Sequence, residues 1–275
     1  MAFLPTTVKE LEQRGWDYVD VIFVSGDAYI DHPSFGCAVI CRYLENAGYR
    51  VAVLAQPNWK DDLRDFKKMG KPRLCFCVSS GCMDSMVNHY TAAKRKRSDD
   101  AYTAGGQAGF RPDRATIVYS NILKQLYPST PVLIGGIEAS MRRLAHYDYW
   151  SDSLMPSILL DSKADMLIYG MGEKVVSEVC NKLREGKKIE ELTDIRQSAY
   201  LCRKPVASPQ GWNDTLLPSF EQCRKDKLAQ AEAIRLFERH SNKSADERLI
   251  QRYEKLGVSV VVNPFDRSYS GEDLD

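Results

Sequence analysis

The alternation of short aliphatic runs with helical patterns is the feature that most constrains the fold of this chain. Runs rich in valine and isoleucine are typical of buried strands, and the segments between them repeat apolar residues with the period of a helix. Strands that alternate with helices in this way form a parallel sheet with helices on both faces. The sequence therefore predicts an α/β fold with a doubly wound, mostly parallel five-stranded sheet. The expected strands are 19–24, 50–54, 74–78, 131–134 and 166–168, and the expected helices are 33–47, 61–68, 113–126 and 174–184.

The same pattern divides the chain into two regions. Residues 1–185 form the expected α/β domain, with residues 1–16 as an N-terminal arm. Residues 186–275 change character and predict an α+β extension that packs on another structure. The final stretch, DRSYSGEDLD, carries no packing pattern, so we expect the C-terminus to be a cut that leaves a fragment. In the extension we expect strands at 198–202 and 258–262 and a long charged helix at 219–240.

Composition limits the partners and the cellular compartment that can be expected for the chain. The 38 lysines and arginines balance 37 acidic residues, so no overall basic field attracts nucleic acid. The sequence has neither a signal-peptide pattern nor an apolar run of membrane-spanning length. Most of the 8 cysteines lie inside apolar runs, which predicts reduced thiols. We therefore expect a cytoplasmic chain without membrane or nucleic-acid partners.

Some polar segments allow more than one interpretation. The basic run KRKR at 94–97 and two nearby tyrosines could bind nucleic acid, whereas the SDD that follows dilutes the charge and favours a solvated loop. The glycine-dense segment 102–114 is interpreted as a lid or docking loop. Arg142 and Arg143 could hold a phosphate or a carboxylate.

Glycine-bearing loops follow four of the expected strands. The carboxyl ends of parallel strands meet at one edge of a sheet, where ligands bind in such folds. Glycine lets backbone N–H groups approach a ligand, although it also serves tight turns that have no ligand. Taken as a set, the four loops favour a crevice for a small-molecule ligand. The expected binding residues are Asp27, Asp31, His32 and Gly36 after the first strand, Ser79 and Ser80 after the third, Gly135, Gly136 and Glu138 after the fourth, and Gly170, Gly172 and Glu173 after the fifth.

His32 and the two glutamates have alternative roles. His32 could ligate a metal as a neutral imidazole held by Asp27 or Asp31. Alternatively, Asp31 or a serine two residues after His32 caps the next helix and leaves His32 as a loop residue. Glu138 and Glu173 follow glycine turns at helix starts, where the helix dipole favours a carboxylate that could also accept a bond from a ribose or an amide.

Two cysteines have part of the spacing of an iron-sulfur motif. In a C-x-x-x-C-x-x-C motif three cysteines bind a 4Fe-4S cluster. Cys37 and Cys41 match the first two positions, but Leu44 occupies the third, and all three lie on or beside a helical stripe. Cys75 and Cys77 point to the same face of a strand and match no such motif. We therefore expect no cluster and no metal in this chain alone.

Longer stretches resemble a known family. The segments GWDYVDVIFVSGDAYIDHPSFG, GFRPDRATIVYSN, PVLIGGIEASMRRLAHYDYW and DMLIYGMGE are similar to the N-terminal region of YgiQ-type radical S-adenosylmethionine (radical SAM) proteins. In that family a cobalamin-domain-like α/β region precedes a partial TIM barrel that carries the cluster motif. The resemblance implies that the 4Fe-4S cluster and S-adenosylmethionine bind only in the full-length protein, where the barrel is a partner in cis that is absent from this chain.

The α/β region is also similar to cobalamin-binding domains. The serine loop after the third strand and the Gly135–Gly136 turn fit the pattern of those domains. The signature Asp-x-His-x-x-Gly does not, because Asp31 directly precedes His32 and Gly36 lies four residues beyond it. The resemblance thus leaves cobalamin open as a ligand, bound without a histidine on cobalt.

These observations lead to two functional hypotheses. In the first, the chain is the N-terminal region of a radical SAM iron-sulfur enzyme of unknown substrate, and it is not catalytic alone. In the second, it is a stand-alone flavodoxin-like module that binds a nucleotide or a partner protein.

Overall fold

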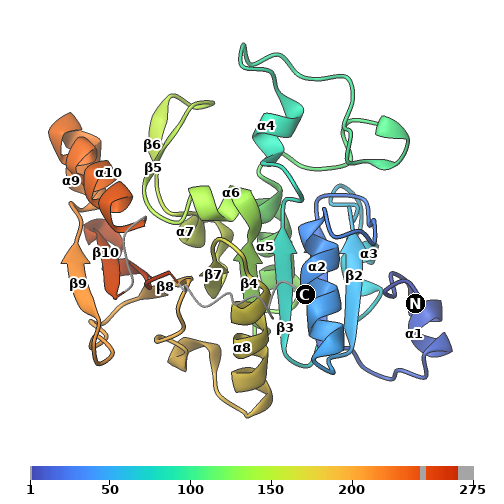
Figure 1. Ribbon diagram of the computed structural model, residues 1–275. Helices are drawn as coiled ribbons and strands as arrows, with labels where there is room; N and C mark the ends of the chain where they lie inside the picture. Colours follow the sequence, from blue (N-terminus) through green and yellow to red (C-terminus); the bar gives the residue numbers. More distant parts are fainter. Residues whose placement is uncertain (1, 242–245, 266–275) are drawn as a thin grey trace.

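A computed structural model describes residues 2–241 and 246–265, and in this part of the chain one 9-stranded sheet runs through the molecule (Figure 1). The strand order is β2-β1-β3-β4-β7-β8-β11-β10-β9. A separate 2-stranded hairpin is formed by β5 (His146–Asp148) and β6 (Ser153–Met155). None of the described helices is both long and apolar enough to cross a membrane. The stretch DRSYSGEDLD, where we expected the chain to be cut, lies outside the described residues.

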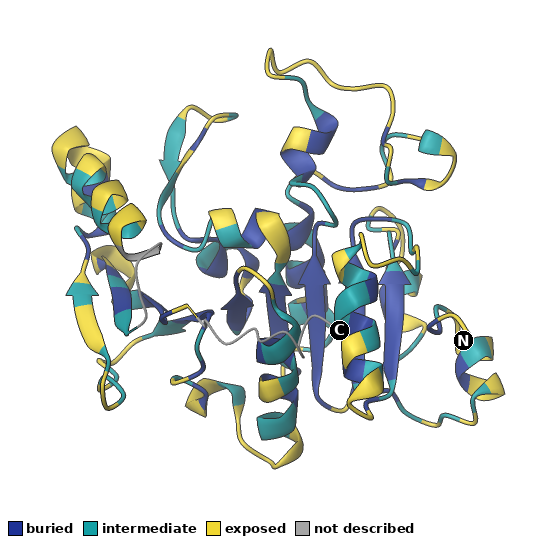
Figure 2. Cartoon of the chain, viewed as in Figure 1, coloured by how far each residue is buried: buried dark blue, intermediate teal, exposed yellow. Residues whose placement is uncertain are grey.

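The first five strands of this order are parallel, as the sequence predicted for a doubly wound sheet. Their residues are aliphatic almost throughout because helices cover both faces of the sheet. The central strands are accordingly buried, whereas the two helices that begin at Phe220 and Lys227 are largely exposed (Figure 2). The five strands are β1 (Val21–Ser25), β2 (Val51–Ala55), β3 (Cys75–Ser79), β4 (Val132–Gly135) and β7 (Met166–Ile168).

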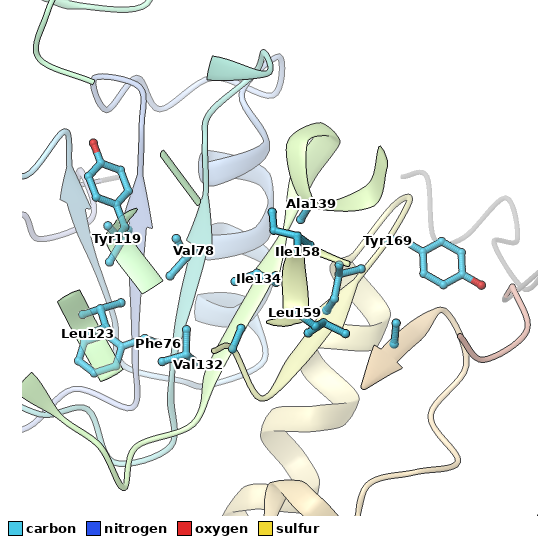
Figure 3. Packing of buried hydrophobic residues seen from close by; sticks show 14 of the residues in the cluster. Phe76, Val78, Tyr119, Leu123, Val132, Ile134, Ala139, Ile158, Leu159 and Tyr169 are labelled. Atoms are coloured by element: carbon cyan, nitrogen blue, oxygen red, sulfur yellow. The ribbon is translucent and has the colours of Figure 1, made fainter. Parts of the chain in front are cut away.

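Alternate residues of each strand enter two separate cores. On one face, Cys75 and Cys77 of β3 pack with α2 (Gly36–Asn46) and α8 (Glu173–Arg184), which confirms that these two cysteines share a face. On the other face, Phe76 and its neighbours pack against α5 (Ala115–Leu126) and α7 (Ile158–Ser162). Figure 3 shows this second core, in which the buried ring of Tyr119 lies beside the strand residues.

The prediction of five strands is wrong because the extension continues the same sheet. Strand β8 (Ser198–Cys202) pairs antiparallel with β7, and β11 (Val258–Val262) pairs antiparallel with β8. Strands β10 (Glu247–Tyr253) and β9 (Asn213–Leu216) complete the edge. Their sequences, ERLIQRY and NDTL, contain charged residues where a buried strand is aliphatic, so their pattern did not indicate strands. The division into domains near residue 185 stays a prediction.

The single helix predicted at 219–240 is two helices, α9 (Phe220–Lys225) and α10 (Lys227–Ser241). Asp226 between them has extended backbone angles, φ −132° and ψ 117°. Its carboxylate accepts a hydrogen bond from the backbone N–H of Leu228 at 2.8 Å, which starts the second helix. The remaining helices are α1 (Val8–Gln13), α3 (Arg64–Lys67), α4 (Ser85–His89) and α6 (Gly136–Met141).

A long excursion of the chain lies over the carboxyl edge of the sheet. It leaves β3, forms α4 and returns to α5, and it stands above the strands in Figure 1. The backbone N–H of Ala28 donates to the carbonyl of Tyr102 at 2.9 Å, and the amide of Gln56 donates to the hydroxyl of Thr103 at 2.7 Å. These bonds hold the predicted lid segment, 102–114, beside the loops that follow β1 and β2.

Candidate ligand site at the carboxyl edge of the sheet

A cavity of about 370 Å³ opens at the carboxyl ends of β1, β3, β4 and β7. All four glycine-bearing loops contribute to its walls, which confirms that they converge on one crevice. Its deeper wall is apolar and includes Phe23, Leu133 and Ile168. The predicted binding residues that line it are Asp27, Gly36, Ser79, Gly135, Gly136, Gly170, Gly172 and Glu173.

Two of the glycines around this cavity are required by neighbouring protein atoms. Gly136 has a φ of +79°, and a Cβ at this position would lie 2.6 Å from the hydroxyl of Ser79. Gly81 has a φ of +108°, and its Cβ would lie 2.0 Å from a carboxylate oxygen of Asp27. At these positions glycine allows three loops to pack closely, as the tight-turn alternative expected. The open cavity in front of the loops is therefore a stronger indication of a ligand than the glycines themselves.

Asp27 places a carboxylate in the wall of the cavity although it is only 3% exposed. Its Oδ2 accepts a hydrogen bond from the backbone N–H of Cys82 at 2.6 Å, and its Oδ1 lies 2.9 Å from a guanidinium nitrogen of Arg111. Burial raises the pKa of Asp27 above its ordinary value, and the nearby Arg111 charge opposes this rise.

Arg111 joins the lid segment to the sheet edge from a fully buried position. Its Nη1 donates to the carbonyl of Ser80 at 2.6 Å, and its Nη2 lies 3.2 Å from Asp100. One guanidinium thus lies between two buried carboxylates. Arg111 lies in the predicted lid segment, but its role could not be predicted, because its partner Asp27 is distant in sequence and no spacing pattern connects them.

Thiols form part of the same wall. Cys37, Cys77 and Cys82 line the cavity, and Cys41 is fully buried behind it. Burial, with the charge of Asp27, raises the pKa of Cys82 to about 11. Burial also raises the pKa of Cys41, so both sulfurs are neutral thiols at neutral pH. Among the described residues, no group of three or more histidine, cysteine or acidic side chains is arranged to hold a metal ion.

His32 and Asp31 lie outside this cavity, in an adjoining groove of about 520 Å³ between α2 and the start of α8. The Nδ1 of His32 accepts a hydrogen bond from the backbone N–H of Ser34 at 3.1 Å. Asp31 pairs with Arg42, which holds the pKa of that carboxyl below its usual range. The alternative in which Asp31 or Ser34 caps α2 is wrong, because the N-cap is Phe35 and no side chain bonds there.

Two other predicted residues lie behind the cavity wall. The hydroxyl of Ser80 donates to the carbonyl of Met83 at 2.9 Å. Glu138 is buried and accepts bonds from the backbone N–H groups of Ser85 and Thr116, both at 2.9 Å. Its carboxylate therefore ties the starts of α4 and α5 to α6.

The two arginines after the Gly135–Gly136 turn also contact protein groups. Arg142 forms an ion pair with Asp84. The guanidinium of Arg143 lies over the rings of Tyr169 and Phe237, at 4.6 Å and 4.4 Å from their centroids. Both cations thus join α6 to neighbouring parts of the fold.

Comparisons with known proteins place these features in a family. The family described as Radical SAM N-terminal matches residues 3–275. A UPF0313 protein of Bacteroides thetaiotaomicron is 53% identical over 99% of this chain and 45% of its own length. A UPF0313 protein of Porphyromonas gingivalis is 54% identical over 95% of this chain and 41% of its own length. The chain thus spans less than half the length of these relatives.

One solved structure is a distant structural neighbour. It is the radical S-adenosylmethionine methyltransferase TsrM from Kitasatospora setae with cobalamin and a [4Fe-4S] cluster bound. Its TM-score is 0.42 at 18% identity, over 66% of this chain and 26% of that chain, and at this level it says nothing about ligands. The sequence match over residues 3–275 is decisive by comparison: the chain belongs to the Radical SAM N-terminal family.

Proposed function

We propose that this chain is the ligand-holding N-terminal region of a radical SAM enzyme, and that cobalamin binds at the carboxyl edge of its sheet. The observation that carries the proposal is the convergence of four loops from parallel strands on one cavity of about 370 Å³. The adjoining groove shares Met171 and Glu173 with this cavity, so a large ligand can extend from one into the other. Cobalamin, S-adenosylmethionine and iron-sulfur clusters all serve radical chemistry.

The residues present fit a ligand that brings its own metal. The apolar wall suits an aromatic or aliphatic group, and the serine and glycine loops leave the rim free of bulky side chains. None of the described residues that line the cavity is a histidine, so the fit is to cobalamin bound without a protein nitrogen on cobalt.

The length of the relatives supports a further region in cis. They extend well beyond the segment that matches this chain. We assign the radical SAM barrel, with its 4Fe-4S cluster and S-adenosylmethionine, to that region. The substrate of the whole enzyme lies outside this proposal.

A cavity-filling variant tests the ligand. Gly172 has ordinary backbone angles, and a Cβ there would meet side-chain atoms of Ile168 and Ile40 at 3.4 and 3.6 Å, so Gly172→Leu fills the cavity without backbone strain. Titration with hydroxocobalamin should change the visible spectrum, and the variant should bind at least about tenfold more weakly. Ala47→Leu, at an exposed position after α2, is the matched control and should bind like the wild type. Absence of any spectral change in the wild type would remove cobalamin.

A further inference from the structure

A separate cavity with a basic rim lies between the segment after β2 and the excursion above the sheet. Its volume is about 250 Å³. Lys60 comes from the first of these segments, and Lys96 and Arg97 come from the second. We call this cavity the basic pocket. The basic pocket contains none of the residues that were predicted to bind the ligand at the carboxyl edge of the sheet.

The three cations of the basic pocket are not neutralised by neighbouring acids. Among the described residues, no carboxylate oxygen lies within ion-pairing distance of Lys60, Lys96 or Arg97. Lys60 instead donates to the carbonyl of Gly109 at 3.2 Å and lies 5.0 Å from the ring centroid of Trp59. No direct ion pair therefore holds these three cations, although the nearby Lys96 charge contributes to lowering the pKa of Asp113 in the same pocket.

Two carboxylates also line the basic pocket, and one of them is already committed. Asp113 bonds to Nδ1 of His89 at 2.6 Å through one oxygen and to the hydroxyl of Tyr90 at 2.7 Å through the other. Asp99 is the second carboxylate of the lining. Both carboxylates keep their charge, so Lys60, Lys96 and Arg97 stand against two acids and the pocket keeps an excess of one positive charge from these side chains.

The backbone of the basic run is fixed by hydrogen bonds, although its side chains are exposed to solvent as the sequence favoured. The backbone N–H of Arg97 donates to the carbonyl of His89 at 2.7 Å, and Tyr90 and Lys96 form an antiparallel bridge. Lys94 points the other way, with its ammonium 4.8 Å from the ring centroid of Tyr149. Folding has already ordered the backbone that carries Lys96 and Arg97, so binding of a ligand does not lose that conformational entropy again.

From this geometry we infer that the basic pocket binds a phosphate group of a ligand. A guanidinium and two ammonium groups supply charge-assisted hydrogen bonds to an oxyanion, and the half-buried Trp59 in the wall offers a surface for an attached planar ring. The volume is below the range of about 300–1,000 Å³ in which whole coenzymes bind, so it suits a small anionic group. The phosphate belongs either to a free mononucleotide or to single-stranded nucleic acid.

The test measures binding of three probes: inorganic phosphate and adenosine monophosphate by calorimetry, and a short single-stranded oligouridylate by fluorescence anisotropy. We expect saturable binding that Lys96→Ala/Arg97→Ala weakens by about tenfold. Lys9→Ala/Lys71→Ala removes the same charge from exposed positions elsewhere and should bind like the wild type. Lys60→Ala repeats the test from the other side of the pocket, and circular dichroism checks that each variant is folded.

The outcomes separate the two sources of phosphate. Oligouridylate that binds more tightly than the mononucleotide assigns the pocket to nucleic acid, and equal affinities assign it to a small molecule. Absence of saturable binding by all three probes would overturn the inference. It would equally be overturned if the Lys96/Arg97 variant and the Lys9/Lys71 control bound with the same affinity.

Discussion

The buried side chain of Arg111 is the residue on which the carboxyl edge most depends. It forms ion pairs with Asp27 and Asp100, both of which are buried, and it also donates to the carbonyl of Ser80. Removing one partner of such a buried group leaves charges without compensation, which costs more than the pair contributed. The lid segment, the loop after β1 and the loop after β3 are thus held by one guanidinium.

Arg111→Met should lower the free energy of unfolding by about 3–5 kcal/mol, because two buried carboxylates lose their cation. Urea denaturation followed by circular dichroism measures the loss. Adding Asp27→Asn and Asp100→Asn to this variant should recover part of it, since the uncompensated charges are then absent. Arg64→Ala, at an exposed ion pair with Asp62, should leave unfolding essentially unchanged. Equal losses for the two arginine variants would contradict this role.

The thiol of Cys82 should make both the stability of the fold and its own reactivity depend on pH. Burial and the charge of Asp27 raise its pKa to about 11 in the folded chain, whereas an ordinary thiol titrates near about 8.5. The folded state therefore holds the proton more tightly, and its contribution to stability is lost as pH rises from the ordinary value through about 11.

Alkylation by iodoacetamide should reveal this shift, because the thiolate is the reacting form. The rate at Cys82, followed by peptide mass spectrometry, should rise with pH through about 11 in the folded protein. In urea the same peptide should react with a midpoint near about 8.5. A folded-state midpoint at the ordinary value would show that Asp27 and burial do not act on this sulfur.

Among the elements, helix α2 decides how the cysteines of the opening loop are used. It carries Cys37, Cys41 and Leu44, and the last two are fully buried against the sheet. A 4Fe-4S cluster needs three thiolates that converge on one cubane. A helix that turns its second cysteine into a core does not present that arrangement.

Anaerobic reconstitution with iron and sulfide should therefore yield far less than one 4Fe-4S cluster per chain, measured by iron and sulfide analysis. Any residual iron should be the same in the Cys37→Ala/Cys41→Ala variant, because nonspecific binding does not depend on these two sulfurs. Near-stoichiometric cluster that disappears in the variant would show that α2 rearranges to bind iron.

The sequence was informative where an element is uniform in character. The aliphatic runs located the five parallel strands, and the quoted segments identified the family that the comparisons confirm. Elements of mixed composition were not predicted: β10, ERLIQRY, combines charged residues with Leu249 and Ile250, and the hairpin of β5 and β6 has no aliphatic run. The pairing of Arg111 with Asp27 escaped as well, since it depends on the folded loops rather than on local pattern.

For the molecule as a whole, the sheet depends on β11. This strand is the sole neighbour that joins β10 to β8 within the described residues, and Val260 and Val261 at its centre are buried. In the described part of the chain, the backbone pairing of β9 and β10 reaches the parallel strands only through β11, while Leu249 and Tyr253 of β10 also pack in the main core.

Val260→Asp should consequently loosen one end of the sheet. A buried unpaired carboxylate there costs about 3 kcal/mol or more, and hydrogen exchange should lose protection in β9 and β10 while β1 and β3 stay protected. Val258→Asp, at the half-buried end of the same strand, is the matched control and should change exchange much less. Uniform loss of protection across all nine strands would show that the sheet unfolds as one unit.

The place of β11 also sets the order in which a growing chain can fold. Synthesis from the N-terminus delivers the five parallel strands and β8 first, so these can assemble while the rest is still being made. Strands β9 and β10 emerge next but have no edge to join, because the strand between them and β8 is the last of the three to be translated. Until it arrives, the outer edge of β8 exposes unpaired N–H and C=O groups, and that interval is when a nascent chain of this kind is most open to pairing with another.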